Sequence, residues 1–323
     1  MKAAVYKKYG PPEVVQIAEI PKPVPKENEI LIQVHTATVN RTDCGFRSAE
    51  YVISRLFSGL WNPKLPVLGN EFCGEISAIG KNVKLFKTGD RVFGYNDKTF
   101  GAHAEYLLMD ENAAVATVPE NLDFATCAAL TEGAHYALRD IRAAKITGGQ
   151  NIMVYGATGA IGSAAVQILK AMGNFVVAVC NSQNVELIRA LGVDIVVDYQ
   201  KEDFTKLQHR FHFIFDSVGK TSFGACKPLL LEKGIYISTE LGKNWQNIFL
   251  ALITPLFGGK KVLFPIPTCT KDDILYIKDL AEKGKFKPLI DSEYPLENIV
   301  EAYKHAESGT KVGNILLHVK AEE

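Results

Sequence analysis

The chain has 323 residues, of which 47% are hydrophobic and 22% are charged, and its 36 basic residues balance 36 acidic ones. This composition excludes an intrinsically disordered chain, and the length indicates two domains rather than one core. A formal net charge of zero, without a long Lys/Arg block, lacks the basic footprint of a nucleic-acid-binding domain. We therefore expect no nucleic acid among the partners.

The chain shows no sign of export or of a membrane span. Lys7 and Lys8 follow Met1 before any apolar run long enough for a signal peptide. The most apolar stretch, Ile248 to Phe257, is about half of the ~20 residues that a helix needs to cross a bilayer, and it contains Pro255. We expect a buried or interface helix there, with a peripheral membrane contact as the alternative, and a cytoplasmic protein.

The cysteines are scattered along the chain without a CxxC pair. They are Cys44, Cys73, Cys127, Cys180, Cys226 and Cys269. This spacing predicts reduced, mostly buried thiols in a cytosolic protein and cannot form a zinc ribbon.

The first 120 residues hold 8 of the 14 prolines and contain short alternating segments, at 29–34, 74–80 and 89–94. Short strands broken by glycine and proline predict an all-β or barrel-like unit. From Leu122 onward the chain becomes rich in alanine, which predicts a helical stretch.

From residue 151 onward, predicted strands and helices alternate. The strands are 151–155, 175–179, 195–197, 211–215, 234–238 and 261–264, and the helices are 163–172 and 186–191, the latter capped by Gly192. This alternation predicts a parallel sheet covered by helices on both faces. After Pro267 we expect helices at 272–283 and 297–305 and strands at 288–290 and 314–319. This tail is too small for its own core, so we expect it to pack on the first unit.

A glycine-rich turn follows the strand at 151–155. It reads Gly156-Ala157-Thr158-Gly159-Ala160-Ile161-Gly162, so that Ala157, Gly159 and Gly162 take the three glycine positions of the GxGxxG pattern. Gly159 would let a pyrophosphate approach the backbone, and Gly162 would let helix and strand pack closely. The turn alone is a weak motif, but its place in a strand–helix–strand unit favours a dinucleotide site over an ordinary turn.

The end of the second strand favours NADPH over NADH. An NAD site carries a carboxylate about 20 residues past the glycines, whereas this chain has Asn181, Ser182 and Asn184 there, and the first acid is Glu186 in the next helix. We expect nothing at this strand end to repel a 2′-phosphate and expect the polar side chains to hydrogen-bond to it. A solvated loop is the alternative.

Further candidate cofactor residues follow the next strands, where open α/β sheets bind ligands. They are Tyr199, Ser217, Val218, Ser238 and Thr239. His209 and His212 lie at the entry to the fourth strand, where their side chains would tend to point to opposite faces. We therefore expect surface or edge positions for them instead of a metal site.

Several segments together resemble the medium-chain dehydrogenase/reductase superfamily. They are Asn40-Arg41-Thr42-Asp43, Leu68 to Glu75, Lys87 to Val92, Gly101 to Tyr106, the glycine turn and Lys311 to Ile315. The chain is most similar to the quinone oxidoreductase branch, which lacks zinc and uses NADPH. The resemblance implies a GroES-like β-barrel catalytic domain over 1–124, completed by 267–323, a Rossmann doubly wound parallel-sheet domain over 125–266, and a homodimer.

Two departures from the zinc alcohol dehydrogenases concern the metal. Those enzymes carry a Cys where this chain has Asn40 and a His where it has Asn70, and an amide is a poor zinc ligand. The stretch 90–106 contains no Cys for a structural zinc site. We expect no bound zinc. The resemblance also places Thr131 near the nicotinamide and Tyr199 in the adenosine phosphate pocket.

These features predict an NADPH-dependent, zinc-independent oxidoreductase that reduces quinones or the activated double bond of α,β-unsaturated carbonyls in a cleft between the domains. Asn40 would donate a hydrogen bond to the developing oxyanion, Tyr51 would donate a proton, and Asp43 would organise the floor of the cleft. Alternatively, Asp43 caps a turn and Tyr51 belongs to a loop. A zinc-free alcohol or aldehyde dehydrogenase and a non-catalytic NADPH-binding sensor or structural protein stay open as alternative functions.

Overall fold

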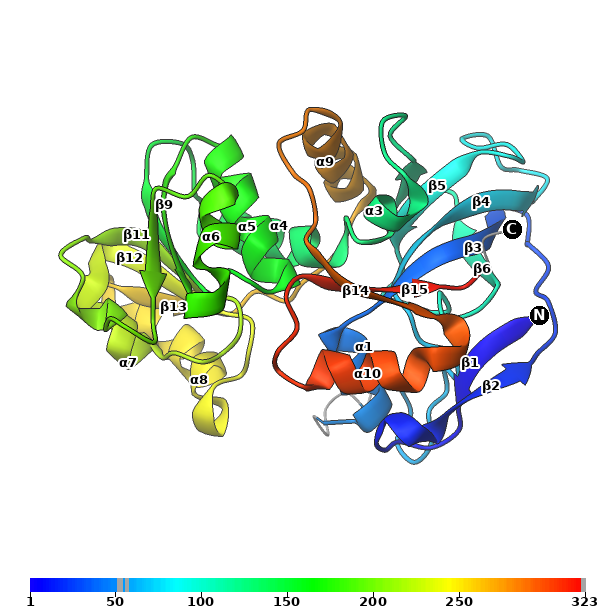
Figure 1. Ribbon diagram of the computed structural model, residues 1–323, viewed down its shortest axis with the longest axis horizontal. Coiled ribbons are helices and arrows are strands. Elements are labelled where there is room, and N and C mark those ends of the chain that lie inside the picture. Colours follow the sequence, from blue (N-terminus) through cyan, green and yellow to red (C-terminus); the bar gives the residue numbers. More distant parts are fainter. Residues whose placement is uncertain (51–54, 56–57, 321–323) are drawn as a thin grey trace. The chain divides into compact units, whose positions relative to one another are not determined.

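A computed structural model of the chain describes residues 1–50, 55 and 58–320. It divides into two compact units (Figure 1). The first unit comprises residues 1–132, 269–282 and 288–323, and the second comprises 133–268 and 283–287. The first unit therefore extends through Glu132, beyond the expected boundary at residue 124, which is the first residue of a helix.

The first unit is built around a mostly antiparallel sheet whose strands come from both ends of the chain, and in which β14 and β15 pair in parallel. Its order is β14-β15-β3-β4-β5-β7, and β6 pairs with β3. The bounds are β3 (Glu29–Val39), β4 (Glu71–Ile79), β5 (Arg91–Tyr95), β6 (Tyr106–Asp110), β7 (Val115–Thr117), β14 (Ile290–Pro295) and β15 (Asn314–His318). A separate antiparallel pair is formed by β1 (Lys2–Tyr6) and β2 (Val15–Glu19).

The tail residues complete the core of this unit. β15 lies antiparallel to β3, with Ile315 opposite Val39, and Tyr303 belongs to the same buried apolar cluster as Phe72. The strand expected at 288–290 is misplaced, because β14 begins only at Ile290. Its side chains alternate between exposed and half-buried, so this edge strand carries little hydrophobic signal.

Helices cover the sheet of the first unit. They are α1 (Arg41–Ser48), α3 (Phe124–Ala128), α9 (Lys271–Glu282) and α10 (Ile299–Glu307), with the short 3-10 helices η1 (Pro12–Val14) and η7 (Leu296–Asn298). α1 and α10 are joined by the buried Arg47, whose guanidinium donates to Glu307 and to the Gly10 carbonyl.

The second unit contains a parallel sheet of order β10-β9-β8-β11-β12-β13. Its strands are β8 (Asn151–Tyr155), β9 (Phe175–Cys180), β10 (Ile195–Asp198), β11 (Phe211–Asp216), β12 (Leu230–Ser238) and β13 (Lys261–Leu263). This is the order of the doubly wound Rossmann sheet, which confirms the predicted fold class. Its central strands are mostly apolar because helices bury both faces.

The connecting helices of this unit follow the prediction, with one shift that matters for the site. They are α4 (Glu132–Ala143), α5 (Ala160–Ala171), α6 (Val185–Ala190), α7 (Phe223–Cys226) and α8 (Gln246–Ile253), with 3-10 turns η2 (Ser182–Asn184), η3 (Phe204–Lys206), η4 (Lys227–Leu229), η5 (Lys243–Trp245) and η6 (Thr254–Phe257). α5 begins at Ala160 instead of the predicted 163, so the helix starts directly at the glycine turn.

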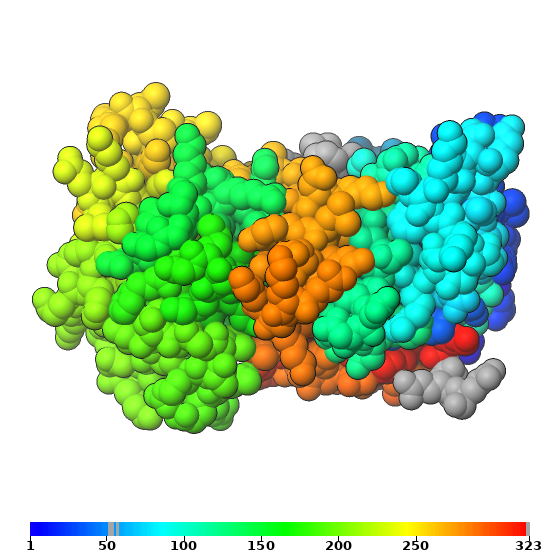
Figure 2. Space-filling view, turned by 90° about the horizontal axis from the view of Figure 1, so that it is seen from above, coloured from blue at the N-terminus to red at the C-terminus, as the bar shows by residue number. Residues whose placement is uncertain are grey.

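The apolar stretch Ile248 to Phe257 forms most of α8 and all of η6. It is not buried within this chain: Phe249 is 64% exposed, Leu252 70%, and Leu256 and Phe257 80% each. The yellow atoms of this part of the chain project from the surface in Figure 2. No helix in the described part of the chain is long and apolar enough to cross a membrane.

Candidate functional site

The fold itself requires two of the glycines in the turn between β8 and α5. Gly156 has a φ of +82°, and a Cβ at this position would lie 2.6 Å from the Val218 methyl groups. A Cβ on Gly162 would lie 2.2 Å from the Gly156 carbonyl oxygen. Both contacts are too close for a side chain, so these glycines allow the turn, the strand and the helix to pack together.

Gly159 is different, because the fold does not require a glycine there. It is the N-cap of α5 with a φ of −71° and a ψ of 168°, and a Cβ would find its nearest neighbour, the Gly156 carbonyl oxygen, at 3.9 Å. Open space therefore lies before the N-terminus of α5, whose first N–H groups have no partner within the helix. This arrangement fits a pyrophosphate, which accepts hydrogen bonds and interacts favourably with the helix dipole.

A buried carboxylate that the sequence analysis missed organises the ends of β11 and β12. Asp216 is fully buried and accepts hydrogen bonds from the Val218 and Thr221 amides and from the Tyr236 hydroxyl. Burial raises the pKa of Asp216. Its carbonyl oxygen accepts from the Thr239 amide at 3.1 Å. The signal in the sequence was an acid that ends an otherwise apolar strand.

The predicted cofactor residues Ser217 and Val218 lie against the glycine turn. The Ser217 hydroxyl contacts the carbonyl oxygens of Tyr155 and Gly156 at 2.9 and 3.0 Å. Ser238 contacts Asp216 through a longer hydrogen bond of 3.4 Å. The structure thus brings together the ends of β8, β11 and β12, as a site at the carboxyl edge of the sheet requires.

The end of β9 is not free of carboxylates, which corrects the expectation from the sequence. The Ser182 hydroxyl donates to Asp198 Oδ2 at 2.5 Å, because β10 lies beside β9 and ends at the same edge. Asn181 and Asn184 bond to each other through their side chains at 2.6 Å. Tyr199 is 48% exposed and stacks on Tyr155, with ring centroids 6.4 Å apart.

In the first unit, Asn40 and Asp43 form a reciprocal cap at the start of α1. The Asp43 amide donates to Asn40 Oδ1 at 3.0 Å, and the Asn40 amide donates to Asp43 Oδ2 at 3.2 Å. Asp43 Oδ1 also accepts from the Gly69 amide at 2.9 Å. Burial raises the pKa of Asp43 to about 7, despite these hydrogen bonds. The capping role weighed for Asp43 is therefore the one it fills, and it also holds the loop before β4.

Asn40 continues into a buried network of polar side chains. Its Nδ2 donates to Asn70 Oδ1 at 2.7 Å, and Asn70 Nδ2 donates to the Tyr95 hydroxyl at 3.1 Å and to Glu132 Oε2 at 3.3 Å. The Thr42 hydroxyl donates to Glu132 Oε1 at 2.7 Å. We call these five residues the amide network.

Glu132 was not singled out from the sequence, yet the pKa of its carboxyl is strongly raised. Burial, together with the nearby carboxylate of Glu71, raises the pKa of Glu132 to about 8. A group with this pKa keeps its proton at neutral pH. No local pattern could have pointed to it, because residues 42, 70 and 132 meet only in the folded unit.

Thr131 directly precedes Glu132 in the chain and is bound to Glu71. Its amide and hydroxyl donate to Glu71 Oε1 at 2.6 and 2.9 Å, and the Thr38 hydroxyl donates to Glu71 Oε2 at 2.7 Å. His103 Nε2 donates to the Thr38 carbonyl at 2.8 Å, and burial lowers the pKa of His103 to about 4, so the ring is neutral. Thr131 is fully buried; a place near the nicotinamide stays a prediction.

Two further predictions concern a proton donor and a metal. Tyr51, the predicted proton donor, lies outside the described residues. Within the described ranges, no three His, Cys, Asp or Glu side chains are grouped closely enough to hold a metal ion. His209 and His212 have separate partners, Phe175 and the Asn151 amide.

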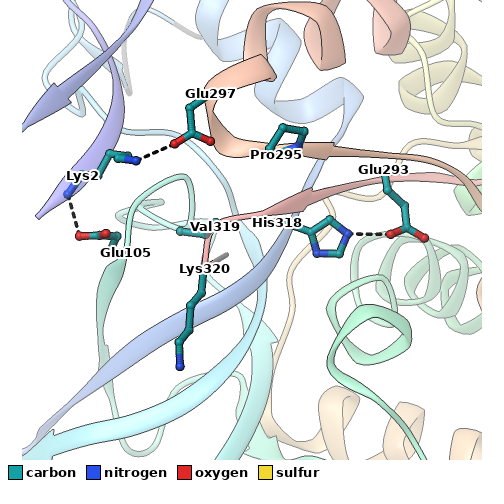
Figure 3. Close-up of a pocket in the computed structure, with 8 residues that line it drawn as sticks. All are labelled: Lys2, Glu105, Glu293, Pro295, Glu297, His318, Val319 and Lys320. Carbon is teal, nitrogen blue, oxygen red and sulfur yellow. Dashed lines mark hydrogen bonds and ion pairs between the residues drawn. The ribbon is translucent and has the colours of Figure 1, made fainter. Parts of the chain in front are cut away.

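A pocket of about 450 Å³ elsewhere in the first unit contains none of the predicted site residues (Figure 3). Lys2 Nζ contacts Glu297 at 2.6 Å, and His318 contacts Glu293 at 2.6 Å. Because these polar side chains of the pocket lining pair with one another, we do not assign the predicted reduction to this pocket.

Comparisons with known proteins agree with this arrangement. The family model of the alcohol dehydrogenase GroES-like domain matches residues 26–120, and that of the zinc-binding dehydrogenases matches 191–317. The 2-methylene-furan-3-one reductase of Solanum lycopersicum is 30% identical, covering 98% of this chain and 79% of the relative. Quinone oxidoreductase of Homo sapiens is 31% identical over 96% of this chain and 95% of the relative.

The fold is also that of a solved reductase. The structure of Escherichia coli quinone oxidoreductase complexed with NADPH superimposes with a TM-score of 0.84 at 24% identity, covering 99% of this chain and all of the other. With the family models and the two relatives, this likeness confirms the GroES-like and Rossmann domains. The chain belongs to the medium-chain dehydrogenase/reductase superfamily, in its quinone oxidoreductase branch, a family of oxidoreductases.

Proposed function

We propose that this chain is an NADPH-dependent, zinc-independent oxidoreductase that reduces quinones or the activated double bond of α,β-unsaturated carbonyls. The observation that carries the proposal is the amide network. It joins Asn40 and Asn70, which stand at the sequence positions of two zinc ligands of the zinc dehydrogenases, to the protonated carboxyl of Glu132. The names of the tomato and human relatives support these two classes of substrate.

The second unit supplies the residues that would hold the cofactor. The N-terminus of α5 and the open space at Gly159 would take the pyrophosphate, and the loops after β9 and β10 would take the adenosine end. Ser217, whose hydroxyl donates to the turn, and Val218, whose amide donates to Asp216, would line the face beside the turn. NADPH, when bound, supplies a hydride.

Zinc does not fit the residues at the position of the catalytic metal. Asn40 Oδ1 accepts the Asp43 amide and Asn70 Oδ1 accepts Asn40 Nδ2, so both amide oxygens are already used. An amide is also a weaker zinc ligand than the thiolate and imidazole found there in zinc enzymes. Although one matching family model bears the name of the zinc-binding dehydrogenases, we propose chemistry without a metal.

Reduction of a quinone or enone leaves negative charge on an oxygen, which hydrogen-bond donors can stabilise. Asn40 Nδ2 has two N–H groups and gives one to Asn70, so the second is available for a substrate oxygen. Glu132 keeps a proton on its carboxyl at neutral pH, and Asn70 joins it to Asn40. Asp43 positions Asn40 through the cap, and Tyr51 stays a proposed proton donor.

A test follows NADPH absorbance in a stopped-flow instrument with a panel of quinones, enones, simple ketones and aldehydes. We expect oxidation of NADPH by quinones or enones and none by simple ketones. Reduction of ketones to alcohols would favour an alcohol dehydrogenase, and tight NADPH binding without oxidation by any acceptor would favour a non-catalytic protein. Metal analysis of protein purified without added zinc should find far less than one equivalent.

We also propose that the exposed apolar residues of α8 and η6 pack against a second copy of this chain. Four large apolar side chains are exposed within one short segment, which is unusual for a surface without a partner. They are Phe249, Leu252, Leu256 and Phe257. Sedimentation velocity should find a dimer that L256S weakens. V24S is the matched control, because Val24 is also 80% exposed but lies in the first unit, and it should leave the dimer intact. A monomeric wild-type protein would contradict this proposal.

A further inference from the structure

The ends of β9 and β10 form one continuous surface in the second unit. The Tyr199 amide donates to the Cys180 carbonyl at 3.0 Å, and the Ser182 amide donates to Gln200 Oε1 at 3.0 Å. With the hydrogen bond from the Ser182 hydroxyl to Asp198, three bonds tie the two loops together. A group that binds at the end of β9 therefore also faces the loop after β10.

On this surface, Lys201 and Asp198 form an ion pair beside Ser182. Lys201 Nζ lies 3.2 Å from Asp198 Oδ2. The Lys201 side chain is 74% exposed and can turn toward a ligand, whereas that of Asp198 is only 9% exposed and is fixed by Ser182 and by the Gln200 amide. The hydrogen bond from Ser182 lowers the pKa of Asp198, so this carboxylate is charged at neutral pH.

The two charges act in opposite directions on a phosphate at this edge. Because the Ser182 hydroxyl donates to Asp198, it does not donate to a phosphate in this arrangement, and the phosphate would meet a fixed negative charge. The Lys201 ammonium is the mobile positive charge next to it. A dinucleotide without the 2′-phosphate brings no charge to this point, and its ribose 2′-hydroxyl can donate a hydrogen bond to the Asp198 carboxylate, so the pair does not penalise it.

We propose that Asp198 and Lys201 set the preference between NADPH and NADH: the Lys201 ammonium attracts the 2′-phosphate and the Asp198 carboxylate repels it. This inference rests on the proposed function, since it assumes that the glycine turn binds a nicotinamide dinucleotide. It adds two charged residues at the end of β10 to the polar residues after β9 and to Tyr199, which the sequence had suggested for this pocket.

The test measures dissociation constants of NADPH, NADH, 2′,5′-ADP and 5′-AMP for the full chain by titration calorimetry. K201M should weaken NADPH and 2′,5′-ADP about tenfold and leave NADH and 5′-AMP unchanged, with the loss shrinking at high salt. D198N should strengthen NADPH and 2′,5′-ADP several-fold. Asp203 and Lys206 form an ion pair with the same i,i+3 spacing, so D203N and K206M are matched controls that should change none of the four constants.

The outcomes separate this inference from the proposed function. A wild-type protein that binds neither dinucleotide would overturn both. If both dinucleotides bind but K201M and D198N leave the ratio of their affinities unchanged, or K201M weakens both equally, only the specificity inference fails. K201M removes an exposed side chain and is expected to fold, so it decides the matter even if D198N is unstable.

Discussion

The glycine turn of the second unit and the amide network of the first unit differ in how far their polar groups are hydrogen-bonded within the protein. At the turn, no side chain caps the N-terminus of α5, and no other group fills the space next to Gly159. In the amide network, Asn40, Asn70 and Glu132 bond to one another inside the protein, apart from the second N–H of Asn40 Nδ2 that we propose for a substrate. Polar groups left open indicate a ligand that completes them, whereas polar groups that pair internally hold a shape and a protonation state.

The largest expected effect tests the open character of the turn. G159V should weaken NADPH binding about 100-fold, because the added side chain would fill the space before α5, and it should leave the melting temperature unchanged. G162A is the contrasting variant: its Cβ would collide with the Gly156 carbonyl, so we expect a loss of about 2 kcal/mol in the free energy of unfolding. Unchanged NADPH affinity in G159V would show that the pyrophosphate binds elsewhere.

A smaller effect is expected from breaking the cap that anchors the amide network. N40A removes the capping oxygen of α1 and leaves Asn70 without its partner, so urea unfolding should show a loss of about 1–2 kcal/mol. N40S keeps a capping oxygen and should recover part of this loss without restoring the bond to Asn70. Wild-type stability in N40A would mean that the network contributes nothing to folding.

The smallest effect concerns the proton on Glu132. Folding raises its pKa from the usual 4.5 to about 8, so the stabilisation is complete below pH 4.5 and is lost as the pH rises to 8. His103 has the opposite dependence but only below its usual pKa of 6.5. Between pH 6.5 and 8, E132Q should therefore flatten the fall in unfolding free energy by about 1 kcal/mol per pH unit. Parallel wild-type and E132Q curves would contradict the raised pKa.

The cofactor turn could be predicted from the sequence because its parts are contiguous. The apolar strand, the glycines and the helix follow one another within 151–171, and hydrophobic periodicity and glycine spacing report such local order. The helix start was misplaced by three residues because Ala160 and Ile161 carry no strong capping signal. The position of Ser217 and Val218 directly after a strand was also predicted, since they follow β11; their contact with a cofactor stays a prediction.

The contacts at the end of β10 and in the amide network could not be predicted from the sequence in this way. Asp198 was not singled out from the sequence, because its contact with Ser182 depends on β10 lying beside β9. Glu132 meets Thr42 and Asn70 across 90 and 62 positions of the chain. One sequence offers no pattern for such pairs, because side-chain neighbours that distant are set by strand order and packing.

The sequence by itself determined the superfamily, the two-domain class, the position of the glycine turn and the loss of the usual zinc ligands at Asn40 and Asn70. These are properties of residue type and of short-range order. Only the tertiary structure decided that these amides pair with each other, that Glu132 lies buried near Glu71 and keeps a proton, and that a charged pair faces the end of β9. The physical reason is that hydrogen bonding, desolvation and Coulomb interaction depend on distance and burial, which the folded chain alone sets.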